Sequence, residues 1–568
     1  MPAPDPANHP RNRRGAFWRE GEVLLLIALV AAAYFLRAGE LTIRGEESRW
    51  ATVAQGMIAS GDWVVPRQFG EPFLSRPPLG NWLIALTTLL RGQCDVWAIR
   101  LPTLLAMLLT TLLVYAVGRS FLGRLGALSA SLAFATMGEV LQMGRVAETD
   151  LLFTFLLSAA VLTWLWGEVR GWRPIFQWAL GYGFAGLAAL AKGPQAPVYF
   201  FGTVAIYLLL RGQLRRLLDR KHWVGVGVFA GIVAAWQIPF TFMAGWDATI
   251  KIWTGDSAAR FTNLSFIETL RHLATYPLEV LGCTAPWSLF LAAFLSRRFR
   301  RSVATLRPVV LLLAIYVAIG FVPCWITPGG MTRYCLPLYP ALALLIGLVV
   351  ERAAETALSP RLQWAWTFGW KSFAAAFAAI TVAIVAVTVL PVPAAAKPWA
   401  QSFSVCVGFA AAAAIGIRIL VGINAASGAK QLRQGVATLA MLMALTYSGL
   451  IVTALAARSN DPRPEIAAVK ARVPADARLV GFNDVHHLFA YYFGLPIELQ
   501  PLETADADWF CFNSVREYRP RLPFEWEEVA AIPVDRNRHA QPENVVVIGR
   551  RLSPLRAAQR ISSGVSGY

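Results

Sequence analysis

Long apolar segments recur from residue 22 to residue 456, and short polar segments separate them. A helix of about 20 apolar residues crosses the hydrocarbon of a bilayer, which is about 30 Å thick. The pattern therefore predicts about thirteen membrane-spanning helices and a polytopic α-helical membrane protein. The predicted spans are residues 22–39, 98–117, 124–142, 150–168, 175–191, 195–211, 222–242, 279–296, 307–325, 335–352, 370–391, 403–421 and 435–456.

A further apolar segment, LGNWLIALTTLL (79–90), is ambiguous. About a dozen residues are too few for a comfortable crossing, so we expect a helix that lies in the membrane interface. If this segment crossed, the basic loops that follow it would move to the outer side. With the segment in the interface, the basic residues fall on the cytoplasmic side, as the positive-inside rule requires. They are Arg13, Arg119, Arg124, Arg170, Arg173, Arg211–Lys221, Arg297–Arg301 and Lys430.

Composition agrees with a membrane protein, because 56% of the residues are hydrophobic and only 15% are charged. Soluble domains are about one quarter charged. The net charge of +18 does not indicate nucleic-acid binding, since Lys and Arg concentrate in the loops between apolar segments. The six cysteines are scattered, which indicates packing rather than a disulfide or metal framework. The basic N-terminal segment lacks a cleavage site, so we expect an uncleaved first helix and a cytoplasmic N-terminus.

With an odd number of spans, the C-terminal part emerges on the outer side, and from about residue 457 it reads as a soluble α/β domain. We expect a transmembrane domain at 1–456, with interfacial helices in its first outer loop (40–97). We further expect an extracytoplasmic α/β domain at 457–552 and a disordered tail at 553–568. The expected strands are ARLVGF, DWFCFN, WEEVAAIPV and ENVVVIGRRL, with helices in DPRPEIAAVKARVP and VHHLFAYYFG.

The predicted outer loops carry most of the ionisable groups that are not on the basic side, whereas the spans are nearly free of charge. A transporter usually keeps ionisable groups near the bilayer midplane. The ionisable groups of the predicted outer loops are Glu46, Glu47, Arg49, Asp62, Arg67, Glu71 and Arg76 in the first loop, Arg145, Glu148 and Asp150 in GRVAETD, Lys192 in LAKGPQAP, and Arg260 in GDSAARF. Tyr334 lies in the outer loop TPGGMTRYCLPLYP.

Carboxylates beside arginines at one membrane face suit group transfer on a phospholipid-linked substrate. Arginine binds phosphate with two parallel hydrogen bonds. A carboxylate can accept the proton of an attacking hydroxyl or stabilise positive charge on a sugar ring.

Simpler roles compete with catalysis at each of these positions. Glu46 and Arg49 also fit a solvated pair at a helix start, and Asp150 fits a helix N-cap. Arg76 and Lys192 fit side chains that reach out to the interface, and Tyr334 fits an aromatic belt.

The segment EESRWATVAQGMIASGDWVVPRQFGEPFLSRPPLGNW resembles the first outer loop of the GT-C glycosyltransferases. The likeness is strongest to the branch containing the aminoarabinose transferase of lipid A, and weaker to protein O-mannosyltransferases. In that branch the loop reads Asp-Glu-Thr-Arg-Tyr-Ala, then Gly-Asp-Trp, then Lys-Pro. GRVAETDLLFTF, GLAALAKGP, APWS and RYCLPLYPALALL are similar to later family segments, in the same order.

The resemblance implies a glycosyltransferase that takes its sugar from a polyprenyl-phosphate donor on the periplasmic face of the bacterial inner membrane. It implies an acceptor in the cell envelope, such as lipid A, protein or another glycan. Glu46 and Asp150 stand at the two catalytic acid positions. Arg49, Arg76 and Tyr334 stand at substrate-binding positions. From the same outer loops we add Glu47, Lys192 and Arg260 as candidate substrate-binding residues.

The chain departs from the family pattern at three places. The first acid is Glu46 rather than Asp, and the Lys before Pro is Arg76. The positions that bind zinc in that branch hold Ser75 and Ser257 here, and adjacent His486 and His487 diverge on a helix. We therefore expect no zinc site and no cofactor, while a divalent-metal requirement stays open. Donor sugar, acceptor identity and oligomeric state also stay open.

Two functions of other classes compete with the glycosyltransferase. One is a lipid-linked-sugar flippase or transporter without transferase activity. The other is an assembly protein whose outer domain recruits a partner.

Overall fold

The computed structural model describes residues 21–258 (side chains to 254), 265–355, 358–390, 403–474, 477–494, 497–501, 507–520, 522–535 and 541–552. The N-terminal basic segment, Arg260 and the predicted tail lie outside the described residues. The chain divides into two compact units. Unit 1 comprises Met1–Leu41 and Leu74–Ala457, and unit 2 comprises Thr42–Phe73 and Arg458–Tyr568.

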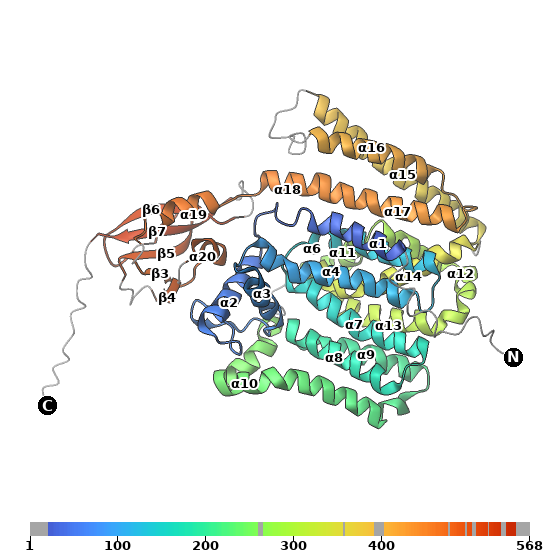
Figure 1. Cartoon of the computed structure of the whole chain (residues 1–568), viewed down its shortest axis with the longest axis horizontal. Coiled ribbons are helices and arrows are strands. Elements are labelled where there is room, and N and C mark those ends of the chain that lie inside the picture. Colours follow the sequence, from blue (N-terminus) through green and yellow to red (C-terminus); the bar gives the residue numbers. More distant parts are fainter. Residues whose placement is uncertain are drawn as a thin grey trace. The chain divides into compact units, whose positions relative to one another are not determined.

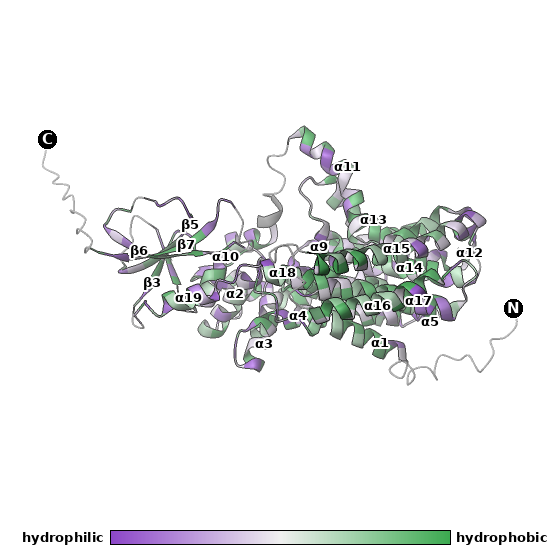
Figure 2. Ribbon diagram, turned by 90° about the horizontal axis from the view of Figure 1, so that it is seen from above, coloured by the Kyte–Doolittle hydropathy of each residue, from purple (hydrophilic) through white to green (hydrophobic). Residues whose placement is uncertain are grey.

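Unit 1 consists of helices that run alongside one another (Figure 1). Hydrophobic residues dominate them (Figure 2). The elements are α1 (Gly21–Val30), η4 (Ala31–Phe35), α3 (Leu79–Arg91), α4 (Val96–Gly118), α5 (Arg124–Thr136), α6 (Gly138–Met143), α7 (Thr149–Arg170), α8 (Pro174–Lys192), α9 (Gln195–Leu210), η5 (Leu214–Leu217), α10 (Arg220–Ala258), α11 (Phe266–Cys283), η7 (Trp287–Leu295), α12 (Arg297–Ser302), η8 (Ala304–Leu306), α13 (Arg307–Ile326), η9 (Thr332–Leu338), α14 (Tyr339–Ala354), α15 (Pro360–Val389), α16 (Phe403–Val421), α17 (Ala429–Leu445), η11 (Thr446–Ile451) and α18 (Val452–Arg458).

The prediction of a polytopic α-helical membrane protein is confirmed. Among the described residues, nine helices are long and apolar enough to cross a membrane, or ten if the bent pair α11 and η7 forms one span. Two other predicted spans are shorter apolar helices, Gly21–Phe35 and Gln195–Leu210. The segment predicted as one span at 124–142 is broken into α5 and α6. The ambiguous segment 79–90 is helix α3, as expected, with Leu86, Leu89 and Leu90 exposed.

Two of the predicted spans, 124–142 and 279–296, are each interrupted by a bend. The backbone at Met137 is extended (ψ 141°), and this residue separates α5 from α6. Helices α11 and η7 meet at an angle of 115°. Pro286 precedes η7 and has no N–H to continue a helical hydrogen-bond ladder.

The described part of segment 243–278, which lies between two predicted spans, is also mostly helical. Helix α10 continues past a kink at Gly245, whose φ of 85° is one that glycine adopts without strain. Helix α11 then begins with a capping box, in which the side chains of Ser265 and Glu268 each accept from the other's backbone N–H. Local capping signals therefore outweighed the polar composition that suggested a loop.

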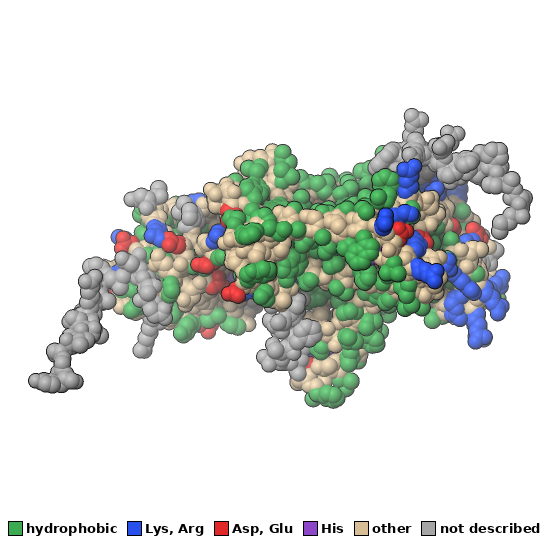
Figure 3. Space-filling view, turned by 90° about the horizontal axis from the view of Figure 1, so that it is seen from below, with side chains coloured by type: hydrophobic (Ala, Val, Ile, Leu, Met, Phe, Trp, Pro, Cys, Tyr) green, Lys and Arg blue, Asp and Glu red, His purple; other side chains and the backbone are tan. Residues whose placement is uncertain are grey.

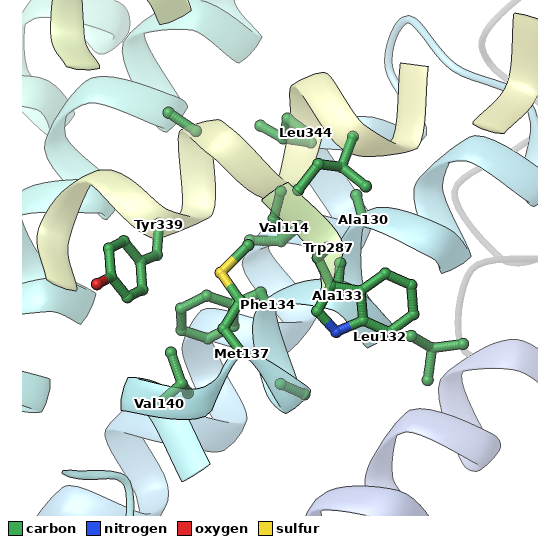
Figure 4. Close-up of a cluster of buried hydrophobic side chains, with 14 of the residues drawn as sticks. Val114, Ala130, Leu132, Ala133, Phe134, Met137, Val140, Trp287, Tyr339 and Leu344 are labelled. Carbon is green, nitrogen blue, oxygen red and sulfur yellow. The ribbon is translucent and has the colours of Figure 1, made fainter. Parts of the chain in front are cut away.

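One part of the core of unit 1 lies where α4, α5, α6, η7 and α14 meet (Figure 4). The labelled side chains include Phe134, Met137, Val140, Trp287 and Leu344. Helices α5 and α14 approach so closely that a Cβ on Gly347 would lie 2.3 Å from the Gly126 carbonyl oxygen. Small residues allow such close packing of membrane helices.

The two ends of the helices of unit 1 differ in charge. At one end the guanidinium of Arg170 donates to the Arg119 carbonyl at 3.3 Å, so α4 and α7 end together. Helix α12, which carries four arginines, lies at this end in two views (Figures 1 and 2). On the face drawn in Figure 3, Lys and Arg side chains gather there too.

Unit 2 contains a five-stranded sheet in the order β4-β3-β5-β7-β6. Strands β4, β3 and β5 are parallel, whereas β7 is antiparallel to both β5 and β6. The four predicted strands and both predicted helices are confirmed, and β4, only four residues long, was not predicted. The elements are α2 (Glu47–Ser60), β1 (Arg67–Gln68), β2 (Glu71–Pro72), α19 (Arg463–Lys470), β3 (Leu479–Phe482), α20 (His487–Phe493), β4 (Ile497–Gln500), β5 (Trp509–Val515), β6 (Trp526–Pro533) and β7 (Asn544–Arg551).

The first outer loop is divided between the units. Residues 42–73, with helix α2, fold against the C-terminal domain, and α2 packs on α20. Phe69 of this segment packs against the hydrophobic cluster that includes Phe489 and Ile548. The polar start of α2 is therefore supported by the terminal domain.

Candidate functional site

Three helix ends of unit 1 bring charged side chains together. Asp150, in the first turn of α7, forms an ion pair with Lys192, the last residue of α8. Arg333 of η9 places its Nε 3.9 Å from Asp150 Oδ2 and its Nη1 3.6 Å from Glu148 Oε1. The Asp150 side chain is only 3% exposed. A buried carboxylate therefore lies among cations from two other segments.

The local sequence explains why these side chains lie at the ends of their helices. Gly193 follows Lys192 with φ of 121°, a conformation that L side chains rarely adopt, and Pro194 precedes α9. The chain thus turns sharply directly after Lys192. Before Arg333, Gly329 has φ of 81° in the segment TPGG, which ends α13 and lets η9 begin.

This charged cluster lies at the end of unit 1 opposite the arginine-rich end. Helix α7 runs from Thr149 at the cluster to Arg170 at the arginine-rich end. At a rise of about 1.5 Å per residue, its 22 residues separate the two ends by about 33 Å. Asp150 and Lys192, which the sequence analysis placed in outer loops, therefore lie together at one end, with Arg333 beside them.

Arg76 and Tyr334 join the same cluster. The Arg76 guanidinium donates to Thr149 Oγ1 and acts electrostatically on Asp150. The Lys192 ammonium lies 5.1 Å from the centre of the Tyr334 ring, within cation–π distance. Four of the predicted site residues (Asp150, Lys192, Arg76 and Tyr334) are thus brought together.

The cluster has more positive than negative charge. Arg76, Lys192 and Arg333 face two carboxylates, Asp150 and Glu148. Guanidinium groups bind phosphate with two parallel hydrogen bonds, and a partly buried setting strengthens such charge-assisted bonds. The arrangement suits an anion that replaces part of the internal ion pairing.

Three further predicted residues, Glu46, Glu47 and Arg49, belong to unit 2. Glu46 precedes the first residue of α2, and its Oε2 lies 2.6 Å from Arg49 Nη1, with about a third of each side chain exposed. Glu47 is buried and accepts a hydrogen bond from the Arg44 backbone N–H at 3.0 Å. An accessible carboxylate and an accessible guanidinium therefore share the first turn of α2.

The described residues contain no group of three or more His, Cys, Asp or Glu positioned to hold a metal ion. The side chain of Ser257 lies outside the described part. His487 Nδ1 lies 2.6 Å from Ser48 Oγ, while His486 Nδ1 accepts from the Leu488 N–H at 3.2 Å. The two imidazoles therefore point their Nδ1 atoms at different partners.

A pocket of about 550 Å³ adjoins the segment that carries Arg333. Thr332, the residue before Arg333, lines it, and the Thr332 hydroxyl lies 3.5 Å from Glu139 Oε2. Glu279 and Tyr447 also line it. The pocket therefore lies within unit 1, at the start of η9.

Sequence reasoning missed Arg333 as a site residue and named Glu148 without assigning it a role. Arg333 directly precedes Tyr334 in TRYCLPLYP, so the motif that drew attention to the tyrosine also contained the arginine. Glu148 lies two residues before Asp150 in GRVAETD. In both cases the signal was present, but the partner lay on another helix.

The chain matches known glycosyltransferases in sequence. The family model described as dolichyl-phosphate-mannose-protein mannosyltransferase matches residues 75–238, which contain Arg76, Asp150 and Lys192. Undecaprenyl phosphate-alpha-4-amino-4-deoxy-L-arabinose arabinosyl transferase 2 of Proteus mirabilis (strain HI4320) is 25% identical over 342 residues, 57% of this chain and 58% of that protein. The corresponding transferase of Pseudomonas paraeruginosa (strain DSM 24068 / PA7) is 25% identical over 326 residues, 55% of this chain and 56% of that protein. The matches thus cover a little over half of these curated relatives.

A solved structure shows the same fold over nearly the whole chain. The crystal structure of ArnT from Cupriavidus metallidurans bound to undecaprenyl phosphate has a TM-score of 0.70 and 19% identity, covering 93% of this chain and 98% of that one. Its apo state has a TM-score of 0.71. By its fold, the chain is a polytopic membrane protein with the GT-C architecture, and its sequence is similar to the aminoarabinose transferases.

Proposed function

We propose that the protein is an integral-membrane glycosyltransferase. It moves a sugar from a polyprenyl-phosphate donor to a cell-envelope acceptor, which is lipid A, a protein or another glycan. The observation that carries this proposal is the cluster of Arg76, Lys192 and Arg333 around buried Asp150 at one end of unit 1. The relatives named above, and the lipid phosphate in the ArnT crystal structure, support it.

The cationic cluster would hold the lipid phosphate as it leaves. An acceptor oxygen attacks the anomeric carbon, and the bond from that carbon to the phosphate oxygen breaks with inversion. The electron pair stays on the lipid phosphate, where Arg76 and Arg333 stabilise the developing charge. Arg49 is a further proposed phosphate ligand.

A carboxylate must receive the proton of a hydroxyl acceptor. Glu46 is the better candidate for this role, because its side chain is accessible. Asp150 is held in an ion pair with Lys192, which suits a residue that orients groups and balances positive charge on the sugar ring. If the acceptor is itself a phosphate, no base is needed, and both acids position groups.

We place the protein in the bacterial inner membrane with its arginine-rich end in the cytoplasm, following the positive-inside rule. The charged cluster of unit 1 then faces the periplasm, where lipid-linked acceptors are available. A cytoplasmic N-terminus and a periplasmic C-terminal domain follow from the same orientation.

Turnover by purified protein tests the proposal. The protein in lipid nanodiscs is incubated with a panel of polyprenyl-phosphate sugars and candidate acceptors, and release of polyprenyl phosphate is measured. We expect release with wild type, slower release with Arg333→Ala at low donor concentration, and wild-type release with Arg298→Gln, an exposed arginine of α12. Donor translocation in vesicles without release would indicate a flippase and contradict the proposal.

A further inference from the structure

We propose that His487 of the terminal domain is a positioning residue for transfer, because it fixes the first turn of α2. That turn carries Glu46 and Arg49, so the inference rests on the proposed function. The terminal domain would then be part of the catalytic apparatus rather than a module that recruits partners. No local sequence pattern indicates this role, since Ser48 and His487 are 439 residues apart.

The contact itself is short and buried. Ser48 Oγ lies 2.6 Å from His487 Nδ1, and the two residues are 0% and 7% exposed. A buried hydrogen bond is costly to leave unmade, because neither partner can turn to water instead. Ser48 lies between Glu47 and Arg49, so this bond acts on the turn that presents the candidate catalytic groups.

The backbone that carries His487 is fixed to the sheet through its neighbour His486. The backbone N–H of His486 donates to Asn513 Oδ1 of β5 at 2.8 Å, and the His486 ring caps α20 through the Leu488 N–H. Asn513 pairs with Val546 in the antiparallel β5–β7 ladder. His487 is therefore the first residue of a helix whose start is fixed to the sheet, which makes it a firm support for Ser48.

Apolar packing alone does not fix the same geometry. Helix α2 also buries Trp50, Val53 and Met57, and Trp50 meets Phe73 edge-on with ring centres 5.6 Å apart. Phe69 of the same segment packs against the core of the terminal domain, so the segment stays on the domain without His487. Apolar contacts are non-directional, whereas the hydrogen bond has a preferred direction and distance. Its loss should move the first turn without unfolding the domain.

Matched variants separate positioning from folding. His487→Ala removes the bond, and His487→Asn restores a polar atom near the place of Nδ1. Phe489→Leu is the control, because Phe489 lies buried on the same helix within the domain core. We expect His487→Ala to lower kcat by about 10- to 100-fold, as for a misplaced catalytic group, with a smaller change in the KM for the donor. We expect His487→Asn to recover most of kcat, and Phe489→Leu to lower Tm but keep kcat.

Ser48→Ala provides the second test from the other side of the bond. It should lower kcat to the same level as His487→Ala, and the double variant should be no worse than either single one. This variant also decides the question if His487→Ala fails to fold. Wild-type kcat in folded Ser48→Ala would overturn the inference.

Hydrogen exchange gives a readout that needs no substrate. Exchange of the backbone amides in the first turn of α2 should rise in His487→Ala and return toward wild type in His487→Asn. If wild type shows no transfer, the proposed function fails, and this exchange still tests the contact. If wild type turns over while His487→Ala keeps wild-type kcat and exchange, the positioning role alone is wrong.

Discussion

Two carboxylates of this protein have similar partners but opposite environments. Asp150 of unit 1 is almost fully buried, pairs with Lys192, and has Arg333 3.9 Å away. Glu46 of unit 2 is about a third exposed and pairs with Arg49 across one helical turn. The first pair joins two helices, whereas the second joins neighbours on one helix.

The difference separates what each pair contributes to folding and to function. Removing one partner of a buried pair leaves an unpaired charge in a medium that solvates it poorly, which costs about 3–5 kcal/mol. An exposed pair within one helix contributes about 0–1 kcal/mol, so the fold does not depend on it. Stability therefore gives a reason for Asp150 to be where it is, and none for Glu46.

Breaking the buried pair should have the largest effect. We expect Asp150→Asn to lower the free energy of unfolding by about 3–5 kcal/mol, because Lys192 then stays buried without its counter-charge. Transfer should fall below detection. Thermal unfolding in nanodiscs and release of polyprenyl phosphate measure the two effects.

The double variant Asp150→Asn/Lys192→Met sharpens this test. It removes both charges, so stability should recover in part while transfer stays absent. If Asp150→Asn alone keeps both the stability and the activity of wild type, the buried ion pair contributes neither to folding nor to transfer, and the comparison with Glu46 fails.

The exposed pair should show the opposite balance. We expect Glu46→Gln to lower kcat by about 100-fold or more, as for loss of a general base, with a change in unfolding free energy of about 1 kcal/mol or less. Glu46→Asp should retain more activity, since it keeps the carboxylate. A variant that is fully active would remove Glu46 from the proposed mechanism.

The sequence predicted the helices of unit 1 and most of the sheet of unit 2, because burial period and length are local properties. Asp150, Lys192 and Tyr334 were named because each lies in a predicted outer loop, and Asp150 and Tyr334 also because they match positions of the family that the sequence resembles. Arg333 was missed because its partners, Glu148 and Asp150, lie on another helix. Partners far apart in the sequence are set by tertiary packing, which no single segment encodes.

The breaks in the helices were missed for a related reason. Apolar composition continues through Met137 and through Ala285–Pro286, so the hydropathy pattern does not change at either place. At the first break the Trp287 ring N–H donates to Thr136 Oγ1 at 3.0 Å. A hydrogen bond from another element thus accompanies a bend that the local sequence alone did not indicate.

Arg333 should show an intermediate effect. We expect Arg333→Ala to lower kcat/KM by about 10-fold or more, mainly through a higher KM for the donor, because one charge-assisted bond to phosphate is lost. Arg333→Lys should recover only part, since an ammonium lacks the planar pair of donors. Equal activity of the Ala and Lys variants with wild type would place the phosphate elsewhere.

The smallest expected effect is a pH dependence of stability that arises from His486, which lies near the exposed pair of Glu46 and Arg49. Burial and the nearby Arg49 guanidinium hold the pKa of His486 below its ordinary value, while Asp484, Glu46 and Asp535 act in the opposite direction. In the folded state, protonation of His486 is therefore disfavoured relative to the unfolded state. The stabilising contribution is fully present above pH about 6.5 and is lost as the pH falls through the lowered pKa.

We expect unit 2 to lose a little stability between pH 7 and pH 5, seen as faster amide exchange in α20. Because asparagine also caps helices well, His486→Asn should keep the fold and remove this pH dependence. Arg49→Gln should make the loss smaller, because without this cation the folded-state pKa of His486 lies closer to its unfolded value. An unchanged pH profile in both variants would show that the exposed pair of α2 has no electrostatic influence on the helix start that supports it.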